Sequence, residues 1–261
     1  DEAQQLVARG HVRSLARACR AELTKTRGTL TLWMVLIAPS LVAAVLVLQL
    51  LAMTPRGPGD GNAWASITQG ILALWAFLML PLFITLEAAL LAAIEHGQQR
   101  WRHLLALPLP RDAHYLAKWI VLALIVVAAH AMFLVLVPLG GWVLMTFKPA
   151  LGVAGPPPWT MIATMAAKCA AASVFLVALH TWIATRWRSF AVACGVGMGA
   201  TVAGFLIGQS KTYGPWYPWS LPVTTLANGP VDLPMLYAYS ACGALVVTLI
   251  GLWEFRRTEE V

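Results

Sequence analysis

Charged residues are scarce in this chain of 261 residues: Asp, Glu, Lys and Arg make up 11% of it, whereas hydrophobic residues make up 59%. Soluble domains carry about 25% charged residues. Three long segments, 28–55, 61–86 and 119–147, contain no charged residue at all. Each of them is long enough to cross a bilayer as a helix. The composition therefore excludes an ordinary soluble domain and predicts an all-α polytopic membrane protein.

Cysteine is also rare, and the cysteines form no C-x-x-C pair. A disulfide framework and a cysteine metal site are therefore excluded. The four cysteines are scattered along the chain: Cys19, Cys169, Cys194 and Cys242. The sequence also lacks the G-x-x-x-x-G-K-[ST] phosphate loop. We therefore expect no ATP-hydrolysing motor in this chain.

Patterns for catalysis and metal binding are missing as well. His130 and His180 lie in apolar segments without a third ligand at suitable spacing, so we expect hydrogen-bonded core histidines. The segment Gly208-Gln209-Ser210 superficially suits a serine protease, but no histidine follows His180 to act as a base. The formal charge is +7, but the basic residues are spread over separate loops and lack the interleaved aromatics of a nucleic-acid site. We expect no catalytic residue, no metal, no cofactor in this chain and no nucleic-acid partner.

The apolar segments predict six transmembrane helices within residues 28–253. Residues 1–27 precede this domain and residues 254–261 form a tail. The lengths of the apolar stretches place the spans at about 30–53, 64–94, 119–146, 159–183, 190–207 and 235–253.

Residues 1–27 have the pattern of an amphipathic helix. One face is apolar and the opposite face is basic. We favour a helix in the membrane interface, with its cationic face toward anionic headgroups, over a solvated basic tail. The apolar face consists of Val12, Leu15, Ala16, Cys19 and Leu23, and the polar face of Arg13, Arg17, Arg20, Thr24 and Arg27.

The distribution of Lys and Arg predicts the orientation. All of them except Arg56, Lys148, Lys168 and Lys211 fall on the side shared by both termini, the 95–118 segment and the turn at Arg186. Cytoplasmic loops carry an excess of Lys and Arg. We therefore expect both termini in the cytoplasm.

The charged segment Glu95–Lys118 separates the second and third spans. Its residues 98–106 are good helix formers with apolar side chains at one-turn spacing, and Pro108 and Pro110 follow. Asp112 can cap the next helix. The segment predicts a short, basic, amphipathic helix at the cytoplasmic membrane face.

Two charged residues stand out as candidates for a translocation path, Lys168 and Glu87. Lys168 lies about eight residues inside the fourth span, where an ionised side chain is costly unless it faces protein or water. It could line the path, pair with a carboxylate, or extend to the outer interface. For Glu87 we favour a structural ion pair with a basic loop residue near the cytoplasmic face.

Small residues in the fifth span predict close helix packing. Gly195, Gly199, Gly204 and Gly208 recur at spacings of four or five residues. The next loop is rich in aromatics, and residues 213–219 could contact an amphipathic peptide. We favour their anchoring the loop among headgroups.

Several short motifs resemble those of type-2 ABC transporter permeases, especially the lantibiotic-immunity and bacitracin-type branch. The likeness covers nearly all of the chain. Its motifs are Glu22-Leu23-Thr24-Lys25, Glu95 with Trp101-Arg102-His103-Leu104-Leu105, Leu107-Pro108-Leu109-Pro110-Arg111, and Tyr115-Leu116-Ala117-Lys118.

This resemblance implies an exporter of two permease subunits, identical or homologous, and two separate ATP-binding subunits that hold ATP and Mg. The amino-terminal helix would be the family's elbow, and the short helix after the second span would be the coupling helix. Its ATPase-coupling residues would be Gln98, Arg100, Trp101, Arg102, His103, Leu104 and Leu105.

The substrate that the resemblance implies is a membrane-active peptide or another amphipathic compound, removed from a bacterial inner membrane for self-immunity or resistance. Export of a drug, lipid or polysaccharide remains an alternative. An integral-membrane enzyme or a passive assembly partner is the alternative from another class.

Overall fold

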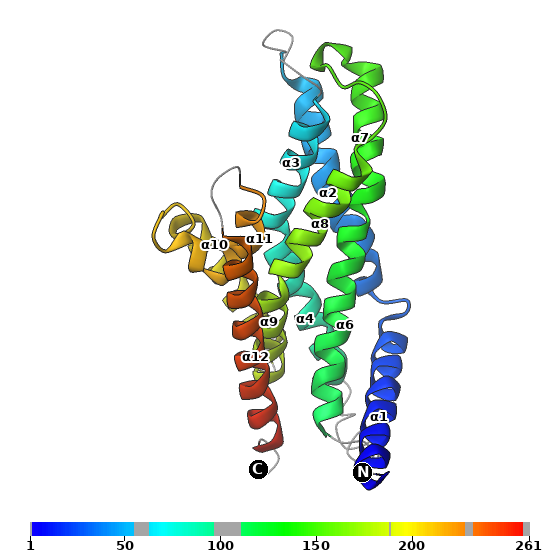
Figure 1. Cartoon of the computed structure of the whole chain (residues 1–261), viewed down its shortest axis with the longest axis vertical. Helices are drawn as coiled ribbons and strands as arrows, with labels where there is room; N and C mark the ends of the chain where they lie inside the picture. The colour runs from blue at the N-terminus through cyan, green and yellow to red at the C-terminus, as the bar shows by residue number, and fades with distance from the viewer. Residues whose placement is uncertain (1, 55–62, 97–110, 188, 228–231, 258–261) are drawn as a thin grey trace.

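The computed structural model describes residues 2–54, 63–96, 111–187, 189–227 and 232–257. In these ranges the regular structure is entirely helical. Most helices run along the long axis of the molecule, and both termini lie at the same end (Figure 1). We call that end the lower end and the opposite one the upper end, as drawn in Figure 1.

The chain alternates long helices with short turns. The proline-rich 156–158 stretch precedes α8, and a left-handed Gly28, with φ of 74°, separates α1 from α2. The helices are α1 (Glu2–Thr26), α2 (Leu30–Ala52), α3 (Trp64–Leu74), the π-helix η1 (Trp75–Met79), α4 (Leu80–His96), α6 (Arg111–Ala131), α7 (Phe133–Phe147), η2 (Pro149–Leu151), α8 (Trp159–Ala172), α9 (Val174–Arg186), α10 (Phe190–Ile207), η3 (Gly214–Trp216), η4 (Pro218–Ser220), α11 (Leu221–Thr224) and α12 (Leu233–Arg257).

Within the described residues, five helical stretches are long and apolar enough to cross a membrane. They are Leu30–Ala52, Trp64–Ala93, Asp112–Phe147, Phe190–Ile207 and Leu233–Arg257. Helices α8 and α9 together make a sixth candidate, bent by 42°. The chain is therefore a multi-pass membrane protein with five or six candidate spans, and the boundaries of the six predicted spans remain predictions.

Three of these stretches are interrupted inside the bundle. The π-helix η1 lies between α3 and α4, Met132 separates α6 from α7, and Ser173 separates α8 from α9. Such breaks free backbone groups that must find partners in an apolar environment. At the Ser173 break, the Ser240 hydroxyl of α12 donates to the Ala172 carbonyl at 3.0 Å and accepts from the Phe175 amide at 3.3 Å. The α8–α9 bend is thus held by a side chain of another helix.

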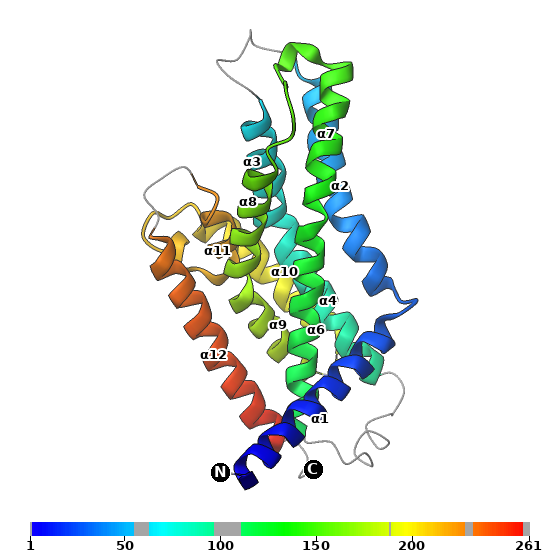
Figure 2. The same ribbon diagram turned by 45° about the vertical axis from the view of Figure 1, so that its right-hand side comes forward.

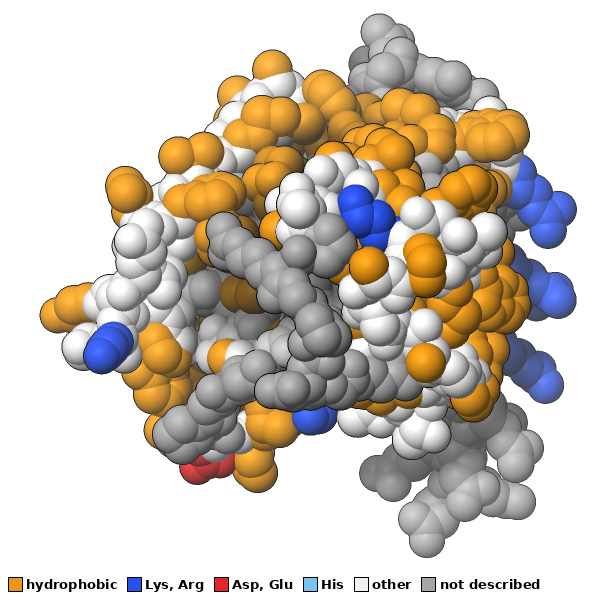
Figure 3. Space-filling model, turned by 90° about the horizontal axis from the view of Figure 1, so that it is seen from above, with side chains coloured by type: hydrophobic (Ala, Val, Ile, Leu, Met, Phe, Trp, Pro, Cys, Tyr) orange, Lys and Arg blue, Asp and Glu red, His pale blue; other side chains and the backbone are white. Residues whose placement is uncertain are grey.

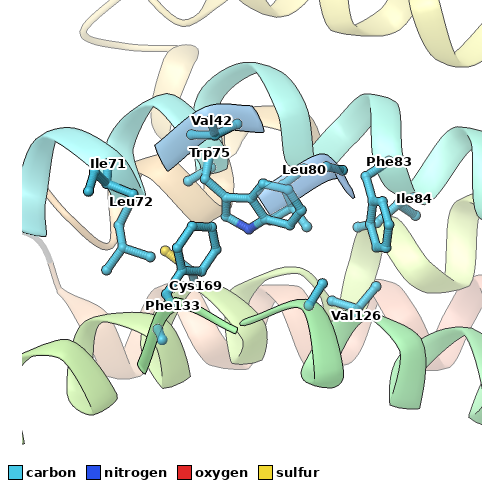
Figure 4. Packing of buried hydrophobic residues seen from close by; sticks show 14 of the residues in the cluster. Val42, Ile71, Leu72, Trp75, Leu80, Phe83, Ile84, Val126, Phe133 and Cys169 are labelled. Carbon is cyan, nitrogen blue, oxygen red and sulfur yellow. The ribbon is translucent and has the colours of Figure 1, made fainter. Parts of the chain in front are cut away.

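The hydrophobic core is centred on Trp75, which is fully buried in η1. Its ring lies 5.3 Å from that of Phe133 and 5.5 Å from that of Phe83. Figure 4 shows the Trp75 indole beside Phe133, and Cys169 of α8 belongs to the same buried cluster. The core therefore joins the interrupted parts of three spans.

At the upper end, α2, α3 and α7 reach well beyond α10 and α12 (Figures 1 and 2). Contacts to backbone carbonyls hold this extension together. Lys148 at the end of α7 donates to the Leu51 carbonyl in the last turn of α2 at 2.7 Å, and the Trp64 indole donates to the Ala154 carbonyl at 3.1 Å. A lysine at a helix C-terminus satisfies an acceptor that the helix leaves open.

At the lower end, α1 crosses α6 at an angle (Figure 2). The buried side of α1 differs from the predicted apolar face. Ala18, Glu22 and Thr26 are buried, whereas Leu23 is 40% exposed. Small side chains on both helices, Ala18 against Ala113 and Ala117, allow the close approach.

Candidate functional site

The predicted coupling residues Gln98, Arg100, Trp101, Arg102, His103, Leu104 and Leu105 lie outside the described residues. The structure does place the two helices that flank them. Helix α4 ends at His96 and α6 begins at Arg111, and the two helices pack against each other. A movement of the 97–110 segment would therefore act first on α4 and α6.

A buried ion pair fastens α1 to the first turns of α6. Glu22 Oε2 lies 3.4 Å from Lys118 Nζ, and the two side chains are only 2% and 4% exposed. Lys25 Nζ reaches Glu22 Oε1 at 2.7 Å. The sequence analysis expected a helix capped at Asp112, and α6, which begins at Arg111, places Lys118 two turns inside that helix. Because unpaired buried charges are costly, this pair restricts how α1 sits on α6.

A second set of contacts joins α6 to α12. Both oxygens of Asp112 accept from Arg256, with Nε at 2.8 Å from Oδ1 and a further contact from the terminal nitrogen. The Tyr115 and Phe255 rings lie 6.0 Å apart. A Cβ atom at Gly251 would lie 2.1 Å from the Tyr115 oxygen, so this helix crossing requires glycine.

Helix α9 is joined to α12 in a similar way. The Trp182 indole donates to Glu254 Oε2 at 2.9 Å, and Arg186 Nε lies 3.6 Å from the same oxygen. The lower ends of α1, α6, α12 and α9 are thus linked in series by charged side chains. We call this set, built on Glu22, Lys118, Asp112, Arg256, Glu254 and Arg186, the lower ion-pair chain.

A small cavity lies where α4, α6 and α9 meet. It is lined by Lys118, by Ala88 and Leu91 of α4, and by Thr181 and Thr185 of α9. Its volume of about 10 Å³ is at the lower limit for a single water molecule. This junction has no room for a transported compound in the conformation described.

Glu87 and Lys168 are not brought together. Glu87 in α4 is fully buried, and neither of its oxygens has a hydrogen-bond partner among the described residues. The Thr31 hydroxyl of α2 faces this carboxyl group, but the two do not reach the geometry of a regular hydrogen bond. Lys168 in α8 is half-buried and forms no ion pair in the described part of the chain. The expected ion pair of Glu87 with a basic loop residue is therefore absent from these ranges, and a translocation role for both residues stays a prediction.

The glycines of α10 behave differently from one another. Gly195 and Gly199 have no atom within 4 Å of a Cβ position, so neither packs closely on the described part of this chain. A Cβ at Gly197 would lie 2.3 Å from Thr85 of α4, whereas one at Gly204 would lie 3.3 Å from Tyr217. Gly208 lies against the carbonyl of Gly204 in its own helix. The close approach to α4 is thus made by Gly197, which the four-residue spacing did not single out.

The predicted core histidines are hydrogen-bonded as expected. His130 Nδ1 lies 2.8 Å from the Val126 carbonyl, and His130 Nε2 lies 3.2 Å from the Trp75 indole nitrogen. Because an indole can only donate, Nε2 accepts and Nδ1 carries the proton. His180 Nε2 lies 3.4 Å from the Thr85 hydroxyl. Among the residues that the structure places, no three His, Cys, Asp or Glu side chains cluster as metal ligands would.

A comparison with protein-family models identifies the chain. Residues 18–204, more than half of its length, match the model described as ABC-2 family transporter protein. The chain belongs to the ABC-2 transporter family. ABC-2 permeases are the membrane subunits of ABC transporters and normally have no ATPase of their own; they typically work with an ATP-binding subunit. The search of curated proteins found no match.

The region that matches the ABC-2 family begins at Ala18 in α1 and ends at Gly204 in α10. It therefore includes Glu22, Lys118 and the undescribed 97–110 segment. Helix α12 lies outside the matched region. The partners of Asp112 and Arg186 in the lower ion-pair chain, Arg256 and Glu254, are on α12 and therefore lie outside it too. The link from α1 to α6 thus belongs to the part shared with the family model.

One element of this ABC-2 permease was missed by the sequence analysis. The aromatics of residues 213–219 were expected among headgroups; Tyr213 and Trp216 are exposed, but Tyr217 and Trp219 pack inward. The Tyr217 hydroxyl donates to the Ala200 carbonyl at 2.6 Å, and the Trp219 ring lies 5.7 Å from that of His180. Helix α11, which follows this segment, packs against η1 and α8. The prolines at 215, 218 and 222 are a signal for turns in the sequence, but the burial of Tyr217 and Trp219 depends on the helices that face them.

Proposed function

We propose that this ABC-2 permease is the membrane subunit of an ATP-driven exporter that expels a membrane-active peptide or another amphipathic compound, for self-immunity or resistance. Two ATP-binding subunits with ATP and Mg and a second permease, identical or homologous, complete the exporter. It sits in a bacterial inner membrane with both termini, and hence the lower end, in the cytoplasm.

The observation that carries this proposal is that α4 and α6, which the 97–110 segment connects along the chain, pack against each other in the core. An ATP-binding subunit that moves this segment pushes on α4 and α6 together. Lys118 of α6 is bonded to Glu22 of α1, and Asp112 of α6 to Arg256 of α12. The lower ends therefore move together, as in a rigid-body transition.

The transport path of this exporter lies between two permease subunits. The supporting feature is the close packing of α4, α6 and α9, which leaves between them a cavity of about 10 Å³, too small for a substrate. A lateral, lipid-facing cavity between the two copies accepts an amphipathic compound directly from the bilayer. Glu87 and Lys168 are candidate residues of the path, since ionisable side chains within a membrane mark functional sites by default.

A defined experiment tests the permease role. The chain is purified with its copurifying subunits and reconstituted, and ATP hydrolysis is measured with and without a membrane-active peptide. We expect stimulated hydrolysis and peptide export. Replacement of Arg102 and Leu105 by acidic residues is expected to abolish the stimulation and the export without preventing insertion.

The matched control is Lys211→Glu, an exposed charge reversal on the opposite side of the predicted topology, which should leave export unchanged. Stimulation by a drug or lipid, but not by peptide, would replace the substrate class and keep the permease role. Turnover of a substrate by the chain alone would overturn the permease role and indicate an integral-membrane enzyme.

A further inference from the structure

Helix α1 presents a stripe of arginines directly opposite the face that packs on α6. Arg13, Arg17 and Arg20 are spaced by four and three residues, which is one helical turn. All three side chains are exposed, and none of their guanidinium groups has a hydrogen bond or ion pair in the described part of the chain. We call Arg13, Arg17 and Arg20 the arginine stripe. Charges that the fold leaves unpaired in this way are available to an outside anion.

The stripe lies close to the start of the apolar surface. Helix α1 ends at Thr26, and α2 begins at Leu30, whose first turn exposes Leu30, Leu32 and Trp33. Lys and Arg side chains project in a row from the edge of the bundle on the side of α1, next to a hydrophobic surface (Figure 3). An exposed tryptophan at a span end is typical of the membrane–water interface. The stripe therefore runs at the level of the lipid headgroups.

Helix α1 also exposes apolar surface beside the stripe. Leu23, 40% exposed, lies on the flank between the buried face of Glu22 and the arginines. A helix that exposes basic and apolar side chains next to each other suits the boundary between headgroups and acyl chains. A purely solvated arm would gain nothing from an exposed leucine at this position.

We propose that the arginine stripe binds the phosphate groups of anionic lipids in the leaflet at the lower end of the molecule. The guanidinium group suits phosphate because its planar fork donates two parallel hydrogen bonds. Glu22 and Lys118 connect this lipid site to α6, so that lipid held on α1 restrains the helix that follows the 97–110 segment. The binding itself depends neither on the transported compound nor on the ATP-binding subunit.

The test measures lipid binding by the full chain in detergent. Native mass spectrometry gives the dissociation constants of phosphatidylglycerol and of phosphatidylcholine at low and high salt. We expect the wild type to prefer phosphatidylglycerol, more strongly at low salt. In the triple variant Arg13→Gln, Arg17→Gln, Arg20→Gln, each lost arginine should weaken phosphatidylglycerol binding by about fivefold at low salt, because a basic residue near an anionic surface contributes about 1 kcal/mol.

Two controls separate this site from general charge effects. The triple Arg→Lys variant retains the charges and should keep most of the preference, and Lys211→Gln removes a charge far from α1 and should change nothing. The arginines point away from the bundle, so the Gln variant should elute and unfold as the wild type does. An unchanged phosphatidylglycerol preference in the triple Gln variant would overturn the proposal. If, in addition, the triple Gln variant no longer copurified with the ATP-binding subunit, the stripe would be a contact site for that protein.

Discussion

The two ends of the molecule are held together by different chemistry. At the lower end, charged side chains of α1, α6, α12 and α9 pair with one another, as Glu22 does with Lys118. At the upper end, side chains donate to backbone carbonyls, as Lys148 does to Leu51 and Trp64 to Ala154. The lower end therefore depends on charge, whereas the upper end depends on backbone geometry.

This difference matters for a transporter. A backbone carbonyl is fixed by its helix, so a bond to it defines one position of the donor. At the lower end both partners of a pair are side chains, so replacing either one removes the contact, as for Glu22 and Lys118. At the upper end the acceptor is part of the backbone, so only a change of the donor, Lys148 or Trp64, removes the bond.

The largest effect is expected from breaking the buried pair of the lower end. Glu22→Ala leaves Lys118 buried without this carboxylate, and we expect a loss of about 3–5 kcal/mol in the free energy of unfolding. Unfolding of the detergent-solubilised chain by denaturant measures it. The double variant Glu22→Met, Lys118→Met removes both charges and should recover most of the loss. Equal losses in the single and double variants would show that packing, not charge, holds α1.

Glycine replacements compare close packing at the two ends. A Cβ atom would lie 2.1 Å from the Tyr115 oxygen at Gly251 and 2.1 Å from the Trp64 ring at Gly141. We expect Gly251→Ala and Gly141→Ala each to cost about 1–3 kcal/mol through overpacking. Gly195→Ala, which has no atom within 4 Å of its Cβ, is the control and should be neutral or slightly stabilising. A tolerated Gly251→Ala would mean that α12 can move off α6 cheaply.

Between the two ends, Ser240 tests the hydrogen bonds at the α8–α9 bend. Ser240→Ala leaves the Ala172 carbonyl and the Phe175 amide without that hydroxyl, at a cost of about 1–2 kcal/mol. Hydrogen exchange of the Phe175 amide should become faster. Ser66→Ala is the control, because among the described residues the exposed Ser66 hydroxyl bonds only to the Ala63 carbonyl of its own turn. Unchanged exchange at Phe175 would show that the bend does not need α12.

The smallest effect concerns the thiol of Cys19 beside the lower ion-pair chain. Burial, and to a lesser extent the charge of Glu22, raise the pKa of Cys19. Less thiolate is therefore present at a given pH, and alkylation should be slow in a chain with Cys19 as its only cysteine. Glu22→Gln removes the smaller cause and should increase the alkylation rate slightly. If the alkylation rate falls instead, the charge of Glu22 does not raise the pKa of Cys19.

The helical, multi-pass class and the transporter family were predictable because they depend on short-range features. The uncharged runs and the motifs around Glu22 and Tyr115 can be found without knowing any contact. Helix faces were less predictable. In α1 the hydrophobic pattern selected Leu23, but the buried side chain is Glu22, because its partner Lys118 lies 96 residues away. In α10 the spacing selected Gly195, but the residue facing Thr85 is Gly197.

By itself, the sequence determined that this chain enters a membrane as several helices and belongs with ABC-2 permeases, because apolar length and short motifs are read along one chain. Only the tertiary structure decided which charges are paired, where the spans bend, and that Tyr217 and Trp219 turn inward. These features depend on the rotation and offset of helices against one another. Helix rotation is set by packing over the whole bundle, which no local pattern contains.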